Sequence, residues 1–457
     1  MFNNTISNYI VSSKIQFEGL SLDRTEIIEI LNEWNYWNKE LPPTQERSFY
    51  DNKISNLLKY NEILVIKGIR RSGKSILMLN SIKNLLLNGV DIKNILFVNL
   101  EDPRFINNLS VELLQEIKDI YLEYLDPDEK PYIFLDEIQN IPNWEKWVNK
   151  EYELKLSNIT ISGSNSSMLS SEIASSLSGR YLQVDVYPLS FKEYLQFNNI
   201  QLKNKLDFID KKIELNRKFE AYLKYGGFPK VLDYEITDKR DLLITYKDSI
   251  LLKDIVARYN LKEFKTLEEI AAFLLANSGI SQSITKLKNK FHISFNMANA
   301  YLEYLIKAYM LFEIPKFDYS LKKQNSNDKK YYSVDLGLSN IMRVPNLQTR
   351  GDDLETVVFL ELLRRGYKVY YYKTSNGLEC DFIIEKENEI VQLIQVTSSI
   401  KDEKTKKREL RVFSKVIEEL KLKNIKILLI YEDGTLNEIY DNLTIEIINI
   451  KEWLIDM

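Results

Sequence analysis

Residues 63–76 read ILVIKGIRRSGKSI, and this stretch decides the fold. Its four leading apolar residues predict a buried strand, Gly68 and Gly73 bracket a short turn, and the pattern after Lys74 predicts an amphipathic helix. Glycines let the backbone turn tightly, so that successive N–H groups and the helix N-terminus point at one phosphate chain. The stretch therefore predicts a P-loop between a strand and a helix.

The polar side chains of this turn suit a nucleoside triphosphate and its magnesium ion. Lys74 is placed to reach the β- and γ-phosphates, and the Ser75 hydroxyl is placed to hold Mg²⁺. The alternative is a glycine turn beside a solvated lysine, but the flanking strand and helix favour the nucleotide site. We expect the phosphates to bind along Gly68, Ile69, Arg70, Arg71, Ser72, Gly73, Lys74 and Ser75.

Residues 131–138, PYIFLDEI, supply an acidic partner for the P-loop. Their apolar run predicts another buried strand, which stops at Asp136 and Glu137. Ligands of parallel α/β sheets bind at the carboxyl ends of the strands. We therefore expect Asp136 to bind Mg²⁺ through water and Glu137 to polarise the water that attacks ATP. An Asp-Glu pair without this context is more often surface charge.

Two further polar positions lie next to later predicted strands. Asn165, in the segment SGSN at 162–165, could contact the γ-phosphate or the attacking water, or it could cap a helix, and both roles can coexist. Arg180 precedes a predicted strand. It is either a charge-stabilising finger, in its own site or a neighbour's, or a structural ion-pair partner.

Composition is that of a soluble globular protein with several domains. The chain has 457 residues, of which 44% are hydrophobic and 28% charged, and its net charge of −4 gives no overall support for nucleic-acid binding. Its one cysteine, Cys380, and one histidine, His292, exclude an intramolecular disulfide and Cys/His zinc sites. No stretch approaches the roughly eighteen apolar residues of a membrane helix, and no secretory leader is evident. We therefore expect a cytoplasmic protein.

Patterns along the chain predict domains in series. The alternation of strands and helices up to residue 195 is typical of a parallel sheet covered on both faces. A helical stretch, a helix-turn-helix pattern and a mixed α/β region follow. We expect an N-terminal lead at 1–45, a P-loop ATPase domain at 46–195, a helical lid or linker at 196–261, a winged-helix-like domain at 262–345 and a further α/β domain at 346–457.

Three segments in the middle of the chain allow more detailed predictions. Gly226–Pro229, GGFP, must interrupt the helical stretch and predicts a hinge or a tight interdomain turn. In the helix-turn-helix pattern, the start of the last helix at 294–299 carries no lysine or arginine. Because phosphate contacts supply most nucleic-acid affinity, a protein-facing role is at least as well supported as DNA binding. The charged run Lys322–Lys330, KKQNSNDKK, predicts a loop.

Read in order, GIRRSGKS, YIFLDEIQNIPNWEKWV, ISGSNSSMLSSEIASSLSGRY, YPLSFKEYL and YGGFP resemble the archaeal-type P-loop ATPases of the AAA/STAND-like group. The resemblance covers nearly the whole chain. It implies an AAA-like ATP-binding domain, a helical and winged-helix middle, and a C-terminal restriction-endonuclease-like domain of unknown function. Carried over by position, Lys74 and Ser75 match the phosphate and Mg²⁺ ligands, Asp136 the second Mg²⁺ ligand, Glu137 the catalytic acid, Asn165 the polar sensor and Arg180 the arginine after the Ser-Gly pair.

The resemblance also implies a nuclease-like site. Such nucleases use an acid on a helix, an Asp on a strand and a Glu/Gln-x-Lys on the next strand, so that the carboxylates hold Mg²⁺ and the lysine supports the attacking water. The matching positions are Glu355 or Glu361 on the helix, Asp381 on the strand and Gln395-Val396-Thr397 after it. The lysine is missing, and Lys401 or Lys373 would have to replace it. This departure favours a degenerate site in a fold kept for binding or dimerisation.

Together these patterns predict an ATP-hydrolysing molecular switch that couples nucleotide state to a rearrangement of its domains or of a partner. Two alternatives stay open: an ATP-regulated DNA-binding or DNA-cleaving protein, and a non-hydrolysing nucleotide sensor that works by assembly. The expected ligands are ATP and Mg²⁺. The expected partner is an unidentified protein or a second copy of the chain, and no membrane contact is expected.

Overall fold

The computed structural model describes residues 22–166, 177, 179–344, 350–432 and 436–456, and this part of the chain forms two compact units. The first unit comprises 22–66, 75–163, 177 and 179–184, and the second comprises 67–74, 164–166 and the described residues from 185 onward. The P-loop turn thus groups with the second unit, whereas the strand before it and the acidic strand end belong mainly to the first.

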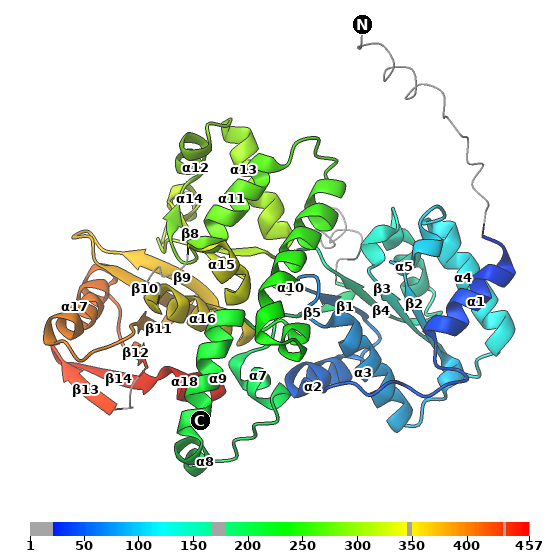
Figure 1. Ribbon diagram of the computed structural model, residues 1–457, viewed down its shortest axis with the longest axis horizontal. Coiled ribbons are helices and arrows are strands. Elements are labelled where there is room, and N and C mark those ends of the chain that lie inside the picture. The colour runs from blue at the N-terminus through cyan, green and yellow to red at the C-terminus, as the bar shows by residue number, and fades with distance from the viewer. Residues whose placement is uncertain (1–21, 167–176, 178, 345–349, 433–435, 457) are drawn as a thin grey trace, which may run out of the picture. The chain divides into compact units, whose positions relative to one another are not determined.

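A five-stranded sheet in the order β2-β3-β4-β1-β5 forms the centre of the first unit (Figure 1). Its strands are β1 (Ile63–Lys67), β2 (Ile95–Asn99), β3 (Tyr132–Asp136), β4 (Asn158–Gly163) and β5 (Tyr181–Asp185). The β2–β3 and β3–β4 pairs are parallel, and β2, β3 and β4 are almost entirely buried, as expected of a sheet covered on both faces. The predicted parallel sheet is confirmed, and β4 separates the P-loop strand from β3.

The first helix of this unit, α1, begins with a capping box formed by Asp23 and Glu26. Asp23 accepts a hydrogen bond from the Glu26 backbone N–H at 2.8 Å, and the Glu26 carboxylate accepts from the Asp23 N–H at 2.9 Å. Buried side chains of α1, α4 and α5 share one core with the sheet. The helical segments are α1 (Arg24–Trp34), α2 (Ser48–Leu57), α3 (Lys74–Leu87), η1 (Ile92–Asn94), η2 (Pro103–Phe105), α4 (Val111–Leu125), η3 (Ile138–Asn140) and α5 (Trp144–Glu153).

From residue 185 onward, the chain of the second unit first forms a helical region. Its segments are α7 (Phe191–Phe197), α8 (Lys205–Asp210), α9 (Lys212–Tyr225), η5 (Pro229–Asp233), α10 (Ile236–Ser249) and η6 (Ile250–Ala257). The α-helix α10 ends at Ser249, and the chain continues from Ile250 as the π-helix η6. We use "the α10–η6 segment" for residues 236–257.

The GGFP break is a tight junction. Gly226 has φ 74°, and a Cβ there would lie 2.0 Å from Oδ1 of Asp335. The Gly227 N–H donates to Oδ2 of Asp335 at 2.6 Å, and the same carboxylate caps the helix α15 (Leu336–Met342). Burial raises the pKa of Asp335 to about 6. One buried carboxyl group therefore joins the GGFP turn to a helix more than a hundred residues later in the chain.

A three-stranded sheet in the order β6-β8-β7 accompanies the helices of the next region. The elements are α11 (Lys265–Ala276), β6 (Ser281–Gln282), α12 (Ile284–Phe291), α13 (Phe295–Lys307), β7 (Leu311–Pro315), α14 (Leu321–Ser326) and β8 (Lys329–Ser333). The expected loop at Lys322–Lys330 is instead most of α14 and the start of β8. Its last residue, Lys330, is 3% exposed, because β8 carries its side chain into the interior. The winged-helix assignment remains a prediction.

The C-terminal region holds a six-stranded sheet in the order β13-β14-β12-β11-β10-β9. Its central pairs β11–β12 and β12–β14 are parallel, and the outer pairs are antiparallel. The elements are α16 (Arg350–Arg364), β9 (Lys368–Lys373), β10 (Glu379–Lys386), β11 (Glu389–Val396), α17 (Glu403–Leu420), β12 (Lys426–Tyr431), β13 (Leu436–Tyr440), β14 (Leu443–Asn449) and α18 (Ile450–Ile455).

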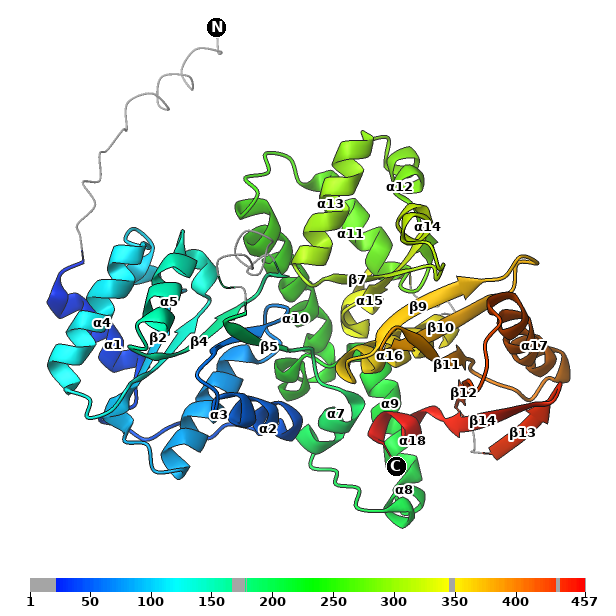
Figure 2. The same cartoon turned by 180° about the vertical axis from the view of Figure 1, so that it is seen from behind.

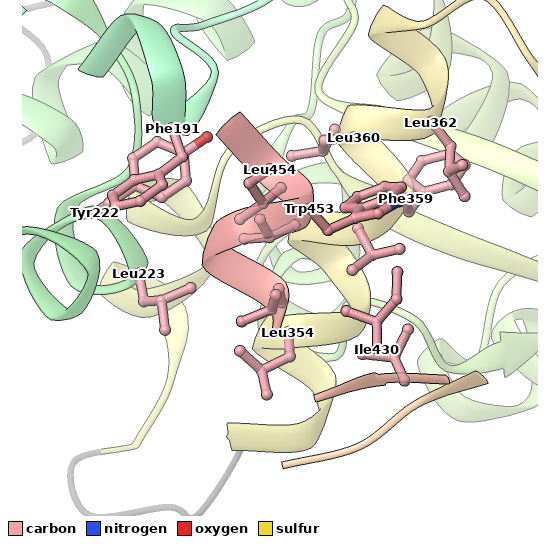
Figure 3. Packing of buried hydrophobic residues seen from close by; sticks show 14 of the residues in the cluster. Phe191, Tyr222, Leu223, Leu354, Phe359, Leu360, Leu362, Ile430, Trp453 and Leu454 are labelled. Atoms are coloured by element: carbon pink, nitrogen blue, oxygen red, sulfur yellow. The ribbon is translucent and has the colours of Figure 1, made fainter. Parts of the chain in front are cut away.

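Helices cover both faces of this sheet. On one face, Phe359 of α16 and Leu454 of α18 pack with Ile430 of β12 (Figure 3). On the other face, α17 contributes Phe413 to a separate core with Ile383 of β10, and the helix lies along the sheet (Figure 2). The core in Figure 3 also takes in Phe191 and Tyr222, so the helical region and the C-terminal sheet share one apolar interior. None of the described helices is long and apolar enough to span a bilayer.

Candidate functional site

The P-loop turn lies between β1 and α3, as its sequence pattern predicts. Gly68 has φ 154°, and a Cβ at this position would lie 2.0 Å from the carbonyl oxygen of Val186. Arg71 and Gly73 also have positive φ values, of 69° and 100°. Turns of this kind direct successive N–H groups to one side and form anion-binding nests. These positive φ values fit the predicted phosphate cradle, which stays a prediction.

The Lys74 side chain folds back over this turn. Its ammonium group donates to the carbonyl oxygens of Gly68 at 3.1 Å and Ile69 at 3.2 Å, and the residue is only 4% exposed. The positive charge is thus held against the turn whose N–H groups are expected to bind the phosphates.

The two predicted Mg²⁺ ligands are in direct contact in the first unit. The Ser75 hydroxyl donates to Oδ2 of Asp136 at 2.6 Å, and the other oxygen of Asp136 accepts from the Ser162 hydroxyl. Asp136 is 4% exposed. A hydroxyl and a carboxylate at this distance fit the preference of Mg²⁺ for hard oxygen ligands. Ser162 is a member of the site that sequence reasoning did not assign, although it lies in the SGSN segment.

Glu137 is held by its backbone. It has φ 55°, in the left-handed region that few residues other than glycine adopt, and its N–H donates to the Ser162 hydroxyl at 3.1 Å. The residue is 8% exposed, and its carboxylate accepts a hydrogen bond from the Gln139 side chain. Ser162 therefore contacts both acidic residues at the end of β3, and Gln139 is a second contact that sequence reasoning missed.

The polar turn after β4 groups with the second unit. Ser164 and Asn165 are both fully buried, and the Ser164 hydroxyl donates to Oδ1 of Asp254 at 3.0 Å. The sensor role of Asn165 stays a prediction.

Arg180 is engaged by α5. Its guanidinium pairs with Oε1 of Glu153 at 2.9 Å and donates to the side chain of Asn149. These contacts fit the structural ion-pair alternative, and the role of an arginine finger also stays a prediction.

Two P-loop arginines contact the α10–η6 segment within the second unit. Arg70 donates twice to the Asp254 carboxylate, from Nε at 3.0 Å and from one terminal nitrogen at 3.2 Å. Arg71 lies over the ring of Tyr246, 4.1 Å from its centroid. Both were expected beside the phosphates. The structure supplies a different set of contacts for their side chains, and Asp254 is a further residue that sequence reasoning missed.

The nuclease-like residues also come together. Gln395 on β11 accepts at Oε1 from the Asp381 N–H at 3.2 Å, and Asp381 lies where the β9–β10 register shifts. Glu355 joins this region from α16, whereas Glu361 pairs with Arg365 at 3.0 Å. Of the two candidate helix acids, Glu355 is therefore the one whose charge acts on Asp381, where it raises the pKa.

The cation in this cluster is Lys330 of β8. Its ammonium contacts Oε1 of Glu355 at 2.8 Å and Oε1 of Glu379 at 2.6 Å. Burial opposes its charge, but the surrounding acidic groups, Glu355 foremost, outweigh that effect and hold the pKa of Lys330 well above its usual value. Burial and then the Glu355 charge raise the pKa of Asp381. Lys330, which the sequence pattern did not single out, is therefore the lysine seen in contact with these acids.

Among the described residues, no three acidic, histidine or cysteine side chains are grouped so that they could hold a metal ion. The acids of this cluster are accompanied by an internal ammonium group, and the cluster is called below the Lys330 cluster (Lys330, Glu355, Glu379 and Asp381).

Known families match three successive parts of the chain. An AAA domain matches residues 60–195, a domain of unknown function (DUF8612) matches 216–349 and another (DUF4143) matches 350–453. The AAA match and the P-loop geometry together support ATP as a ligand. Among solved structures, the Walker-type ATPase paby2304 of Pyrococcus abyssi aligns with 67% of this chain and 99% of its own, with 15% identity and a TM-score of 0.41.

Two relatives match over most of their length. The uncharacterized protein MJ1544 of Methanocaldococcus jannaschii is 34% identical over 460 residues, which cover 98% of this chain and 95% of that protein. An uncharacterized protein of Haemophilus influenzae is 33% identical over 359 residues, 77% of this chain and 86% of that protein. In this chain an AAA domain precedes two domains of unknown function. The chain belongs to the family of these uncharacterized proteins.

Proposed function

We propose that the protein is a Mg²⁺-dependent ATPase that acts as a molecular switch. The observation that carries the proposal is the Ser75–Asp136 contact at 2.6 Å, with Glu137 immediately after Asp136. Serine after a P-loop lysine and aspartate at a strand end are the residue types that hold Mg²⁺ in ATPases. Their direct contact in an AAA domain favours a working hydrolytic site over a glycine turn with incidental surface charge.

Each residue then has a defined task. The turn N–H groups and Lys74 bind the β- and γ-phosphates, and Ser75 and Asp136 hold Mg²⁺, which when bound neutralises charge on the phosphates. Glu137 orients the attacking water and accepts its proton. Ser162 fixes both acidic residues through its contacts with the Asp136 carboxylate and the Glu137 N–H.

The test is Mg²⁺-dependent ATP turnover of the wild type beside Glu137→Gln and Lys74→Ala. We expect Glu137→Gln to bind ATP but to lose turnover, and Lys74→Ala to lose both. Glu116→Gln is the matched control, because Glu116 is an exposed acid on α4 of the same AAA domain. Turnover that Lys74→Ala leaves unchanged would show that hydrolysis comes from elsewhere.

A second candidate is ATP-regulated DNA binding. The observation that favours it is the set of exposed basic residues Lys404, Lys407 and Arg411 on α17, although the whole chain has a net charge of −4. Duplex DNA that stimulates ATP turnover at low salt, with loss of the effect as salt rises, would support this function. We do not extend it to DNA cleavage, because Lys330 pairs with Glu355, the acid expected to hold Mg²⁺, and the described residues include no group of three acidic, histidine or cysteine side chains that could hold a metal ion.

A further inference from the structure

The α10–η6 segment contains an unusual buried acid. Residues 250–257 read ILLKDIVA and form a π-helix, in which Asp254 is the one acidic residue and is only 1% exposed. π-Helical turns that interrupt or continue an α-helix frequently lie at functional sites. A buried carboxylate is retained only where charged or hydrogen-bonding partners compensate its loss of hydration.

The partners of Asp254 come from two turns that precede it by many residues. Arg70 of the P-loop donates to both carboxylate oxygens, at 3.0 and 3.2 Å, and Ser164 donates to one of them at 3.0 Å. A bidentate contact of this kind restricts the orientation of the guanidinium group as well as its distance from the carboxylate. One carboxylate therefore holds both the P-loop and the turn that carries the predicted sensor Asn165.

Neighbouring P-loop residues reinforce this attachment. Ile69 is buried in the same core as Leu243 and Ile250 of the α10–η6 segment. Arg71, which has a positive φ of 69°, lies over the Tyr246 ring. Three consecutive residues of the phosphate-binding turn are thus fixed to one helical segment by an apolar contact, an ion pair and a cation–π contact.

We propose that Asp254 is a positioning residue that sets the P-loop conformation and transmits nucleotide binding to η6. The inference rests on the proposed function of the P-loop as an ATP site. Because coupling between two sites is reciprocal, a nucleotide that alters the packing of η6 must bind differently when the η6 contact is removed.

The test compares Asp254→Asn with Asp248→Asn, which makes the same change at a half-exposed acid of α10. Two quantities are measured on the full chain: the affinity for a fluorescent ATP analogue, and amide hydrogen exchange of residues 250–257 with and without the ATP analogue. We expect the analogue to slow exchange at 250–257 in the wild type and in Asp248→Asn. In Asp254→Asn we expect this effect to vanish and affinity to fall on the order of tenfold, within the usual range for coupled sites.

Variants of Arg70 separate positioning from a general loss of structure. Arg70→Ala should reproduce the Asp254→Asn effects, Arg70→Lys should restore part of the affinity, and the double variant Arg70→Ala/Asp254→Asn should be no weaker than either single variant. If Asp254→Asn does not fold, the comparison of Arg70→Ala with Arg70→Lys carries the test. Unchanged affinity in Asp254→Asn, or additive losses in the double variant, would overturn the inference.

The two proposals fail in different ways. A wild type that binds the analogue and slows exchange at 250–257, but does not turn over ATP, removes the ATPase proposal and keeps the role of Asp254. A wild type that turns over ATP, but whose hydrogen exchange at 250–257 does not change when the analogue binds, keeps the ATPase proposal and removes the role of Asp254. A wild type that binds no nucleotide overturns both.

Discussion

Replacing Lys330 with methionine tests whether the internal ammonium group is essential to the C-terminal sheet. Methionine has a similar length and no charge, so Lys330→Met leaves Glu355, Glu379 and Asp381 without the cation that they surround. Removing one partner of a buried ion pair destabilises a protein by about 3–5 kcal/mol. Because Glu379 is 35% exposed and stays partly hydrated, we expect the lower end, about 3 kcal/mol.

The assay is amide hydrogen exchange at residues 379–386 of β10, because a chain of several domains need not unfold in a single step. A loss of about 3 kcal/mol corresponds to exchange roughly 100 times faster, since each 1.4 kcal/mol is tenfold. The control is Lys322→Met, an exposed lysine of the neighbouring α14.

The effect should depend on pH in a definite direction. Burial and the Glu355 charge raise the pKa of Asp381 above its unfolded value, so its ionised form is the unfavourable one in the folded protein. In Lys330→Met the defect should therefore be largest at neutral pH and should shrink as the acids become protonated on acidification. Protection of β10 within a few-fold of the wild type at neutral pH would refute this account of the Lys330 cluster.

Three further predictions follow from single contacts. Gly68→Ala should abolish binding of an ATP analogue, because its Cβ would lie 2.0 Å from the Val186 carbonyl oxygen, whereas Gly351→Ala, with open space around it, should bind normally. Burial raises the pKa of Asp335 from 3.8 to about 6. The protonated group should therefore stabilise the folded protein below pH 4, and this stability should be lost as the pH rises past 6. The loss is about 3 kcal/mol, and urea unfolding at several pH values should show a flatter profile for Asp335→Asn. Mixing Glu137→Gln and Arg180→Ala chains should give only the sum of their separate ATP turnovers, because Arg180 is paired within its own chain. Turnover above that sum would instead require a site shared by two copies.

The parallel sheet and the P-loop were predictable because their signals are local. A buried strand appears in the sequence as an apolar run, and the polar residue that ends it, such as Asp136, lies at the ligand-binding edge in any parallel sheet. The Ser75–Asp136 contact follows from this rule and from the strand order. The roles of Asn165 and Arg180 depend on contacts with ligands or neighbours, and for these the local pattern carries little information.

The missed residues make contacts between distant parts of the chain. Asp254 is 184 positions from Arg70, and its surroundings in the sequence resemble an ordinary apolar helix with one charge. Lys330 lies at the end of a run that is charged and poor in apolar residues, which normally indicates a solvated loop. Its burial follows from the pairing of β8 with β7 and from acids on α16 and β10. Composition could not reveal either pairing.

The Lys330 cluster also bears on how this protein can be divided and inherited. Lys330 lies in the segment that matches one domain of unknown function, and Glu355 and Glu379 lie in the segment that matches the other. A fragment that starts at residue 350 would keep the acids and lose their cation, together with Phe191 and Tyr222 of the shared core. The two segments are therefore expected to fold as one body. If recombination replaced the C-terminal segment alone, the acids of the new segment would have to match the residue already present at position 330. The two segments are therefore expected to be inherited together.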